Sequence, residues 1–429
     1  MNHDLIKTVI FDQHEAISTA DLVKRNYTFE YELNYVLVGL RRAGKTMLLY
    51  SIVKDLVSKG VEWNQIIYIN FEDERLAEFT LSDFNDIVMV KNELTDKKGY
   101  YFFDEVQNID SWEKFARRLA DQKEFVYITG SNSKMLSSEI NATLGGRYMP
   151  KYISTFSFSE FLDSKKIPYN ESALLSTSSK GKIIRFFDEY YIYGGFPEIR
   201  NIHAKREYVS NVYQKIILSD VASRNNIRNE NAMKLIVKKV AESVKNEISY
   251  SKLHNTVKGV GVSVSKDSLI DYVGYLEDAF LFFDIKNYFA SFVDKQSNPK
   301  YYFNDNGFLN LFLINENSSL FENQIGLFLH NRYQDELFYL KSNETKVDID
   351  FYIPEENTAV QAAYSIEGEA RKRETENLVR YAKTNRSCRL IIVTYNEETT
   401  IESDGFIIEV IPAYKFILGR AEKTKNGLF

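Results

Sequence analysis

The chain has 429 residues, of which 44% are hydrophobic and 27% charged, a composition typical of globular proteins with two to four domains at this length. It carries 54 Lys and Arg against 60 Asp and Glu, a formal net charge of -6, so the chain as a whole lacks the basic character that binds nucleic acid. The single cysteine, Cys388, excludes an intramolecular disulfide and favours a reducing compartment. No stretch reaches the roughly 20 apolar residues of a membrane helix, so we expect a cytoplasmic protein without a membrane partner.

Apolar segments in the first third of the chain alternate with segments long enough to form helices. The apolar segments cover residues 35–41, 66–72, 100–105 and 125–131. This alternation predicts a parallel β-sheet with helices on both faces. The first segment stops at a glycine, and MLLYSIVKDLVSKG follows with apolar residues at helical spacing, which predicts a strand, a loop and a helix in that order.

The loop between this strand and this helix reads GLRRAGKT and fits the phosphate-binding pattern G-x-x-x-x-G-K-[ST]. In this pattern backbone N–H groups at the amino end of the helix surround the phosphates, the lysine reaches the β and γ phosphates, and the last hydroxyl binds Mg2+. The side chains of Arg41 and Arg42 are expected to face solvent. The predicted nucleotide-binding residues are Gly39, Arg42, Ala43, Gly44, Lys45, Thr46 and Met47.

About 60 residues later, an apolar strand ends in Asp104 and Glu105. We predict that Asp104 and Thr46 hold Mg2+ and that Glu105 orients or deprotonates the attacking water, because phosphoryl transfer depends on positioning and charge neutralisation. Two acidic residues after a strand also occur in solvated turns. The phosphate-binding loop upstream favours the catalytic interpretation.

The strand after that one runs into Thr129-Gly130-Ser131-Asn132, at the end of the sheet where the γ phosphate is expected. Asn132 or Ser131 is therefore a candidate contact of that phosphate, and we predict Asn132 as a catalytic residue. Arg147 lies in LGGRY and is predicted as an arginine finger, which stabilises transferred phosphoryl charge. Action on its own subunit, action on a neighbouring subunit, and a surface arginine on a glycine turn all stay open.

The middle of the chain predicts mainly helices. SALLSTSSKGK, at residues 172–182, predicts a loop or linker. From about residue 205 helices precede a strand at residues 279–285, the order of a winged helix-turn-helix. A recognition helix over Ser265–Leu276 would present Lys266, Ser268 and Asp271 to DNA, and because this is a weak basic complement we favour a role in protein packing. Strands alternate with helices again near the end, at residues 336–341, 347–353, 359–366 and 390–396.

GLRRAGKT, FFDEVQNIDSWEKFARRLAD, ITGSNSKMLSSE, LGGRY and FSFSEFL resemble, in this order, an AAA-type ATPase family of bacteria and archaea that carries a nuclease-like C-terminal domain. The resemblance covers essentially the whole chain, and its more specific part joins Gln107 and Trp112 to the acidic pair. It implies ATP as the nucleotide, hydrolysis as the reaction and Arg147 as the finger. The expected fold class is α/β, with a P-loop NTPase parallel sheet over residues 1–160, a helical linker and winged helix over 161–295, and a restriction-endonuclease-like domain over 296–429.

The nuclease-like fold needs an acid on one strand and an acid-x-Lys on the next to bind Mg2+ and activate water. Asp348 and Asp350 lie on the first of these strands, but the second carries Gln361 and Ala363 at the acid and lysine positions. We therefore predict a nuclease-like scaffold without cleavage activity, with Glu322 and Asp350 as remnants. A lysine supplied from elsewhere, such as Lys346, is the alternative.

These features together predict an AAA-type protein that binds and hydrolyses ATP with Mg2+ and acts on an unknown DNA or protein partner. A homo-oligomer is one arrangement left open. The alternatives are a nucleotide-gated binding switch with little turnover and an ATP-dependent DNA nuclease. The five histidines are scattered and the chain has one cysteine, so no zinc pattern exists and Mg2+ is the only metal predicted.

Overall fold

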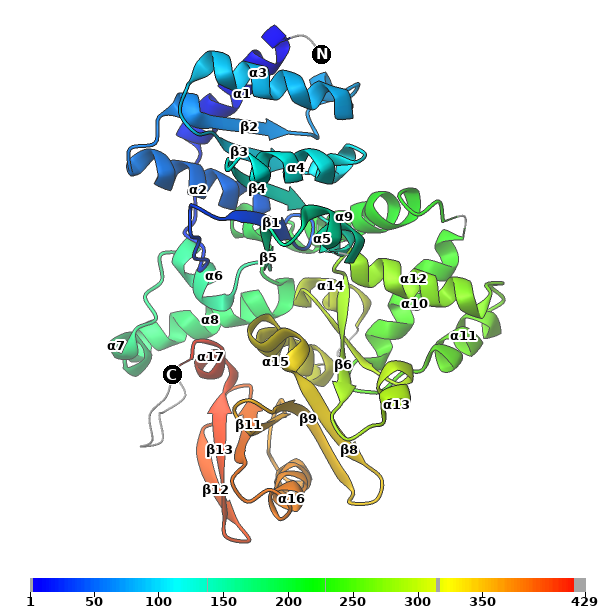
Figure 1. Ribbon diagram of the computed structural model, residues 1–429. Helices are drawn as coiled ribbons and strands as arrows, with labels where there is room; N and C mark the ends of the chain where they lie inside the picture. The colour runs from blue at the N-terminus through cyan, green and yellow to red at the C-terminus, as the bar shows by residue number, and fades with distance from the viewer. Residues whose placement is uncertain (1–2, 137, 228, 314–316, 420–429) are drawn as a thin grey trace. The chain divides into compact units, whose positions relative to one another are not determined.

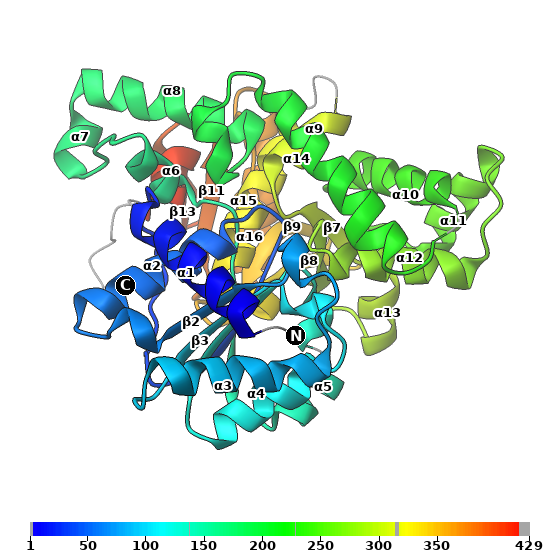
Figure 2. The ribbon, with the colours of Figure 1, turned by 90° about the horizontal axis from the view of Figure 1, so that it is seen from above.

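A computed structural model describes residues 3–136, 138–227, 229–313 and 317–419. These residues form two compact units, whose elements are labelled in Figures 1 and 2. Unit 1 comprises the chain up to Thr155 together with Asp278–Phe280, and unit 2 comprises Phe156–Glu277 and the chain from Leu281 onward. Within the described ranges, none of the helices has both the length and the apolar character that crossing a bilayer requires.

Unit 1 contains a five-stranded sheet in the order β2-β3-β4-β1-β5, and all of its strand pairs are parallel. The strands are β1 (Asn34–Val38), β2 (Ile66–Asn70), β3 (Tyr100–Asp104), β4 (Phe125–Gly130) and β5 (Tyr148–Tyr152). The parallel sheet and its first four strands are confirmed. The edge strand β5 was not predicted, because it contains Pro150 and exposed side chains, which suit an edge and obscure the strand pattern.

Helices cover both faces of this sheet, as predicted (Figure 2). The core on one face combines strand residues such as Val36 and Phe103 with α3, α4 and the first half of α1. The core on the other face combines Leu37 and Phe102 with α2, because successive side chains of a strand point to opposite faces. The helices are α1 (His3–Thr19), α2 (Lys45–Ser58), α3 (Phe84–Leu94), α4 (Trp112–Asp121) and α5 (Ser138–Leu144), with short 3-10 turns η1 (Trp63–Gln65), η2 (Glu74–Leu76), η3 (Leu81–Asp83), η4 (Val106–Asn108) and η5 (Ser133–Leu136).

Unit 2 begins with α6 (Phe158–Ser164), α7 (Glu171–Leu175) and α8 (Thr177–Tyr193). The prediction of a loop at residues 172–182 was wrong, because α7 and the start of α8 occupy this segment. The Asn170 side chain caps α7 by accepting a hydrogen bond from the Ala173 N–H at 3.0 Å. The later turns of α8 bury Ile183 and Phe187. Tertiary packing therefore stabilises a helix whose serine-rich first turns have weak helix propensity.

Three helices precede a strand, in the predicted order, and a second strand, which was not predicted, pairs with it. The helix α12 covers the predicted recognition helix, and β6 and β7 pair antiparallel. The order of these elements agrees with a winged helix, which stays a prediction. The elements are η6 (Pro197–Asn201), α9 (Lys205–Lys215), the π-helix η7 (Ile216–Ser223), α10 (Glu230–Ser243), α11 (Tyr250–Gly259), α12 (Lys266–Asp278), β6 (Phe282–Asn287), α13 (Phe292–Ser297) and β7 (Lys300–Phe303).

The remaining strands extend this hairpin into a mixed eight-stranded sheet in the order β12-β13-β11-β10-β9-β8-β6-β7. Because β6 pairs with β8, strands on either side of the predicted boundary at residues 295–296 belong to one sheet. The helix α16 packs on one face, and Gly326 of α15 faces Phe351 on the other. The strands are β8 (Phe338–Ser342), β9 (Val347–Ile353), β10 (Thr358–Ala362), β11 (Arg389–Thr394), β12 (Thr399–Ser403) and β13 (Phe406–Pro412), and the helices are α14 (Asn306–Phe312), α15 (Asn317–Tyr333), η8 (Gln334–Glu336), α16 (Glu369–Ala382) and α17 (Ala413–Ile417).

Candidate active site

The GLRRAGKT loop connects the carboxyl end of β1 to the amino end of α2. Gly39 has a φ of +154°, and a Cβ at this position would lie 2.1 Å from the carbonyl oxygen of Ile153. Gly44 caps α2 in the left-handed conformation with a φ of 94°, which glycine adopts at little cost. The two glycines thus allow a tight loop that places the positive end of α2 at the carboxyl end of the parallel sheet.

Lys45 is the first residue of α2, and its side chain is only 4% exposed. Its Nζ donates hydrogen bonds to the carbonyl oxygens of Gly39 at 2.9 Å and Leu40 at 3.2 Å. The same Nζ lies 4.0 Å from Oε1 of Glu105. The structure therefore brings together the lysine of the loop and the second acid of the predicted pair.

The other predicted residues of the loop differ in exposure. Ala43 is fully buried, whereas Arg42 is exposed and has a left-handed φ of 63°. Met47, on the first turn of α2, is half exposed. Arg41 is partly buried and its guanidinium forms an ion pair with Glu72 at 3.1 Å. Of the two arginines that we expected to face solvent, Arg42 is exposed and Arg41 is held against a neighbouring loop.

Asp104 ends β3 and is completely buried. Its carboxylate accepts hydrogen bonds from the hydroxyl groups of Tyr68, at 3.0 Å, and Thr129, and the Thr46 hydroxyl lies close enough to affect its pKa. Burial raises the pKa of Asp104, and the neighbouring Glu105 raises it further, while the three hydroxyl groups lower it. The two predicted metal ligands, Thr46 and Asp104, therefore lie close together.

Glu105 adopts the left-handed conformation, with φ 52° and ψ 43°. A non-glycine residue with a positive φ is uncommon and costs free energy unless its surroundings hold it. Here the Thr129 hydroxyl accepts a hydrogen bond from the Glu105 backbone N–H at 2.9 Å. The Gln107 amide donates to Oε2 of Glu105. This backbone conformation and its two contacts place the carboxyl group beside Lys45.

Thr129, at the carboxyl end of β4, connects both acids and was not singled out in the sequence. Its side-chain oxygen donates a hydrogen bond to Asp104 and accepts one from Glu105. Asn132 is buried at the same end of the sheet, but its Oδ1 accepts a hydrogen bond from the Lys134 N–H at 2.7 Å. Ser131 is buried beside it. The residue that contacts the acidic pair is thus three positions before the one that the sequence favoured.

Arg25 is a second residue of this site that sequence reasoning missed. It is 7% exposed, and its guanidinium donates to the carbonyl oxygens of Ala43 at 2.9 Å and Ser154 at 2.7 Å. These two bonds connect the phosphate-binding loop to the segment after β5. Charge-assisted bonds of this kind fix a loop more firmly than neutral ones, so Arg25 stabilises the position of the phosphate-binding loop.

Parts of this chain match known protein families, and the whole chain resembles two proteins of other organisms. Residues 32–162 match the family model described as an AAA domain, and residues 184–319 match a domain of unknown function. An uncharacterized protein of Methanocaldococcus jannaschii is 32% identical over 96% of this chain and 95% of its own length, and one of Haemophilus influenzae is 30% identical over 89% and 94%. The chain belongs to the same family as these two proteins.

The similarity of this chain to a solved structure is weaker than its similarity to these two proteins. The Walker-type ATPase of Pyrococcus abyssi is 12% identical to this chain with a TM-score of 0.42, over 69% of this chain and 99% of that one. The AAA domain is therefore assigned from the family match and from the site itself. The segment that matches the AAA domain contains the phosphate-binding loop, both acids and the parallel sheet.

Arg147 lies away from the other predicted site residues of the AAA domain. It directly precedes β5, and the first residue of that strand pairs with Asn34, the first residue of β1. Because β1 and β5 are parallel, Arg147 lies at the amino end of the sheet, whereas the phosphate-binding loop follows the carboxyl end. The five residues of β1 separate the two ends by about 13 Å. Nε of Arg147 instead pairs with Asp121 at 2.6 Å.

The predicted remnants of a nuclease site lie together in unit 2. Glu322 on α15 and Asp350 on β9 are buried, and Gln361 of β10 accepts a hydrogen bond from the Asp350 N–H at 3.3 Å. Lys346 is exposed in the turn before β9. The lysine that faces both carboxylates is Lys300 of β7, which the sequence did not indicate.

Proposed function

We propose that this protein binds ATP and hydrolyses it at the site of its AAA domain. The observation that carries the proposal is the convergence of the loop and the acidic pair. Thr46 lies close to Asp104, and Nζ of Lys45 lies 4.0 Å from Oε1 of Glu105, all at the carboxyl end of one parallel sheet. Ligands of such sheets bind at this end. The residues lie where bound phosphates and an attacking water would have to meet.

The donor atoms of the site suit Mg2+. Thr46 and Asp104 offer a hydroxyl and a carboxylate oxygen, which are the hard ligands that this ion prefers. Bound Mg2+ would neutralise charge on the phosphates during transfer. Lys45 and the amino end of α2 would bind the phosphate oxygens, for which Gly39 and Gly44 leave the necessary space.

Glu105 is proposed as the residue that orients or deprotonates the attacking water. Its carboxyl group faces the site, and Thr129 fixes the backbone conformation from which it projects. We assign Thr129 a positioning role for both acids and keep Asn132 as the candidate contact of the γ phosphate. Thr129 contacts both acids, whereas Asn132 lies three residues later at the same end of the sheet.

Arg147 is proposed to act on the nucleotide of a neighbouring subunit. Its position at the amino end of the sheet puts the nucleotide of its own subunit out of reach, so a finger function requires a homo-oligomer. A mixing experiment tests this. Arg147→Ala has an intact nucleotide site without a finger, and Lys45→Ala has a finger without a working site, so the mixture should hydrolyse ATP faster than either variant alone. Equal rates in the mixture and the separate variants would exclude the assignment.

A nucleotide-gated switch with little turnover is the second candidate. It is favoured by the contacts of Glu105, since Gln107 donates to this carboxylate and Lys45 lies near it. A glutamate held in this way does not face water freely. Gln107→Ala distinguishes the two functions, because it should raise the rate of hydrolysis if the contact restrains Glu105, and lower it if the contact positions Glu105 for catalysis.

Unit 2 is proposed to carry the partner-binding function. Helices α10 to α12 and the β6–β7 hairpin follow the order of a winged helix, and the C-terminal strands follow that of a nuclease-like domain. The predicted recognition helix α12 offers Lys266 but also Asp267 and Asp271. Its mixed charge favours a protein partner over DNA. ATP hydrolysis would then drive a change in the contact with that partner.

The proposed activity is tested with purified full-length variants. Lys45→Ala should lose ATP binding and hydrolysis, and Glu105→Gln should bind ATP but lose hydrolysis. Lys59→Ala, which removes an exposed lysine just after the same helix, serves as the matched control and should behave as the wild type. Unchanged hydrolysis in both site variants would refute the assignment.

A further inference from the structure

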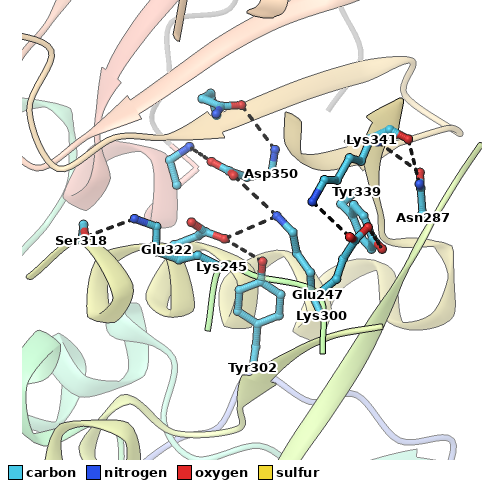
Figure 3. A network of polar contacts seen from close by, with 12 residues as sticks. Lys245, Glu247, Asn287, Lys300, Tyr302, Ser318, Glu322, Tyr339, Lys341 and Asp350 are labelled. Atoms are coloured by element: carbon cyan, nitrogen blue, oxygen red, sulfur yellow. Dashed lines mark hydrogen bonds and ion pairs between the residues drawn. The ribbon is translucent and has the colours of Figure 1, made fainter. Parts of the chain in front are cut away.

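Unit 2 contains a buried cluster in which one ammonium group faces two carboxylates (Figure 3). Nζ of Lys300 lies 3.9 Å from Oε1 of Glu322 and 3.8 Å from Oδ1 of Asp350. The side chains of Lys300 and Glu322 are both 2% exposed. Lys300 lies on β7, Glu322 on α15 and Asp350 on β9, so the fold brings together three residues that are far apart in the sequence.

Surrounding groups complete the hydrogen bonding of the two acids. The Tyr302 hydroxyl donates to Oε1 of Glu322 at 2.8 Å, and the Ala362 N–H donates to Oδ2 of Asp350 at 2.9 Å. The ammonium of Lys300 also lies 5.1 Å from the ring centre of Tyr339, a distance at which a cation interacts favourably with an aromatic ring. Each member of the cluster therefore has partners supplied by the chain itself.

The cluster does not fit a divalent metal. The predicted nuclease-like fold would place Mg2+ between an acid on one strand and an acid on the next, but the second strand supplies Gln361, whose Oε1 accepts from a backbone N–H. Across the described parts of the chain, no group of three or more His, Cys, Asp or Glu side chains is arranged to hold a metal ion. The position between the two carboxylates faces a fixed positive charge, which would repel a second cation.

We propose that Lys300 permanently replaces the metal ion in this cluster. This inference builds on the proposed nuclease-like character of the C-terminal strands and is independent of ATP hydrolysis in unit 1. The ammonium stabilises the buried acids as a divalent cation would, but it cannot coordinate a water molecule and activate it for attack on a phosphodiester. The C-terminal part is then a scaffold whose acids have a structural function.

Burial explains why the cluster needs a built-in cation. Burial raises the pKa of the Glu322 and Asp350 carboxyl groups, and for Lys300 the nearby carboxylates outweigh burial and raise the pKa of the ammonium. An unpaired carboxylate in such surroundings is strongly destabilising. Removing Lys300 should therefore destabilise the folded protein unless another cation binds between Glu322 and Asp350.

The test measures thermal unfolding of the nucleotide-free full-length protein with and without Mn2+, used as the probe. The wild-type midpoint should show no Mn2+-dependent rise that Asp350→Asn removes. Lys300→Met should unfold at a lower temperature and recover part of the loss when Mn2+ is added, because a ligand that binds only the folded state raises its stability. The recovery should disappear in Lys300→Met/Asp350→Asn. Lys341→Met is the matched control: Lys341 lies on β8 and is paired with Glu247 at 3.0 Å, and its removal should give no response to Mn2+ beyond that of the wild type.

Two results would overturn the proposal. The first is a folded Lys300→Met protein that shows no Mn2+-dependent shift. The second is a wild-type protein whose midpoint rises with Mn2+ and loses that rise in Asp350→Asn. If Lys300→Met does not fold, the wild-type comparison decides alone, and the absence of an Asp350-dependent shift supports the proposal. ATP hydrolysis by the Lys300→Met protein should equal that of the wild type, so failure here is distinguishable from failure of the proposed ATPase.

Discussion

Replacing Thr129 by valine removes one hydroxyl group and preserves the size and branching of the side chain. In the wild type this hydroxyl donates to the Asp104 carboxylate and accepts from the Glu105 N–H. Valine leaves both groups without this partner at a position that is completely buried. The substitution therefore tests whether one side chain positions both acids.

The expected loss follows from the two hydrogen bonds. A bond to a charged group contributes about 1.5–3 kcal/mol to stability and a neutral one about 0.5–1.5 kcal/mol, so Thr129→Val should lower the free energy of unfolding of unit 1 by about 2–4 kcal/mol. For a unit of this size, that lowers the unfolding midpoint by roughly 4–16 °C. Glu105 also loses the contact that holds its left-handed backbone, and a catalytic group displaced by about 1 Å loses up to about 100-fold in rate.

Steady-state phosphate release and thermal unfolding measure the two effects on the same preparations. Thr129→Ser keeps the hydroxyl and should retain most of the turnover, which separates loss of the hydrogen bonds from loss of packing. Thr129→Val should lower kcat more than it raises KM for ATP, because the nucleotide-binding loop is not changed. A valine variant with the kcat and midpoint of the serine variant would refute the positioning role of Thr129.

Three further substitutions probe Arg25, the first glycine of the phosphate-binding loop and the partly buried His330. Arg25→Ala removes the two bonds that join the loop at Ala43 to the segment after β5 at Ser154, and we expect ATP affinity, measured by titration, to fall about 10- to 100-fold, or about 1.4–2.8 kcal/mol; unchanged affinity would contradict this. Gly39→Ala should fold poorly because its Cβ would meet a carbonyl oxygen at 2.1 Å, whereas Gly60→Ala has a φ of +97° but meets nothing within 4 Å; equal midpoints would show that the clash is relieved. Burial lowers the pKa of His330 to about 4, so below about pH 6.5 the unfolded chain takes up a proton that the folded chain does not, and stability should fall by about 2 kcal/mol between pH 7 and pH 5. Urea unfolding at both pH values should show a smaller fall for His330→Phe, and an identical fall would exclude His330 as the cause.

The elements that the sequence predicted well are those whose apolar pattern is continuous. The strands β1 to β4 are buried on both faces and read as apolar runs. The edge strand β5 has no such run, and α8 begins with residues that favour turns, so both depend on packing that a local pattern does not contain. The β12–β13 hairpin was missed although Asp404-Gly405, with the left-handed φ values of 50° and 77°, is a recognisable hairpin turn signal.

The residues of the candidate sites likewise fall into those that a local motif predicts and those that only the fold brings together. Lys45 and Thr46 could be predicted because the phosphate-binding pattern fixes their spacing, and Asp104 and Glu105 because they stand at the end of an apolar strand. Arg25 could not, since it contacts a carbonyl 129 residues away and no motif surrounds it. Lys300 was missed for the same reason, because only the folded structure brings β7 close to the acids of α15 and β9.

A single-turnover measurement with excess enzyme over labelled ATP tests the central claim most directly. Wild-type protein should convert the bound ATP to ADP, and Glu105→Gln should bind the same amount of ATP and leave it intact. Rapid hydrolysis by Glu105→Gln, or intact ATP on the wild-type enzyme through the course of the reaction, would contradict the account of this site as an ATP-hydrolysing centre.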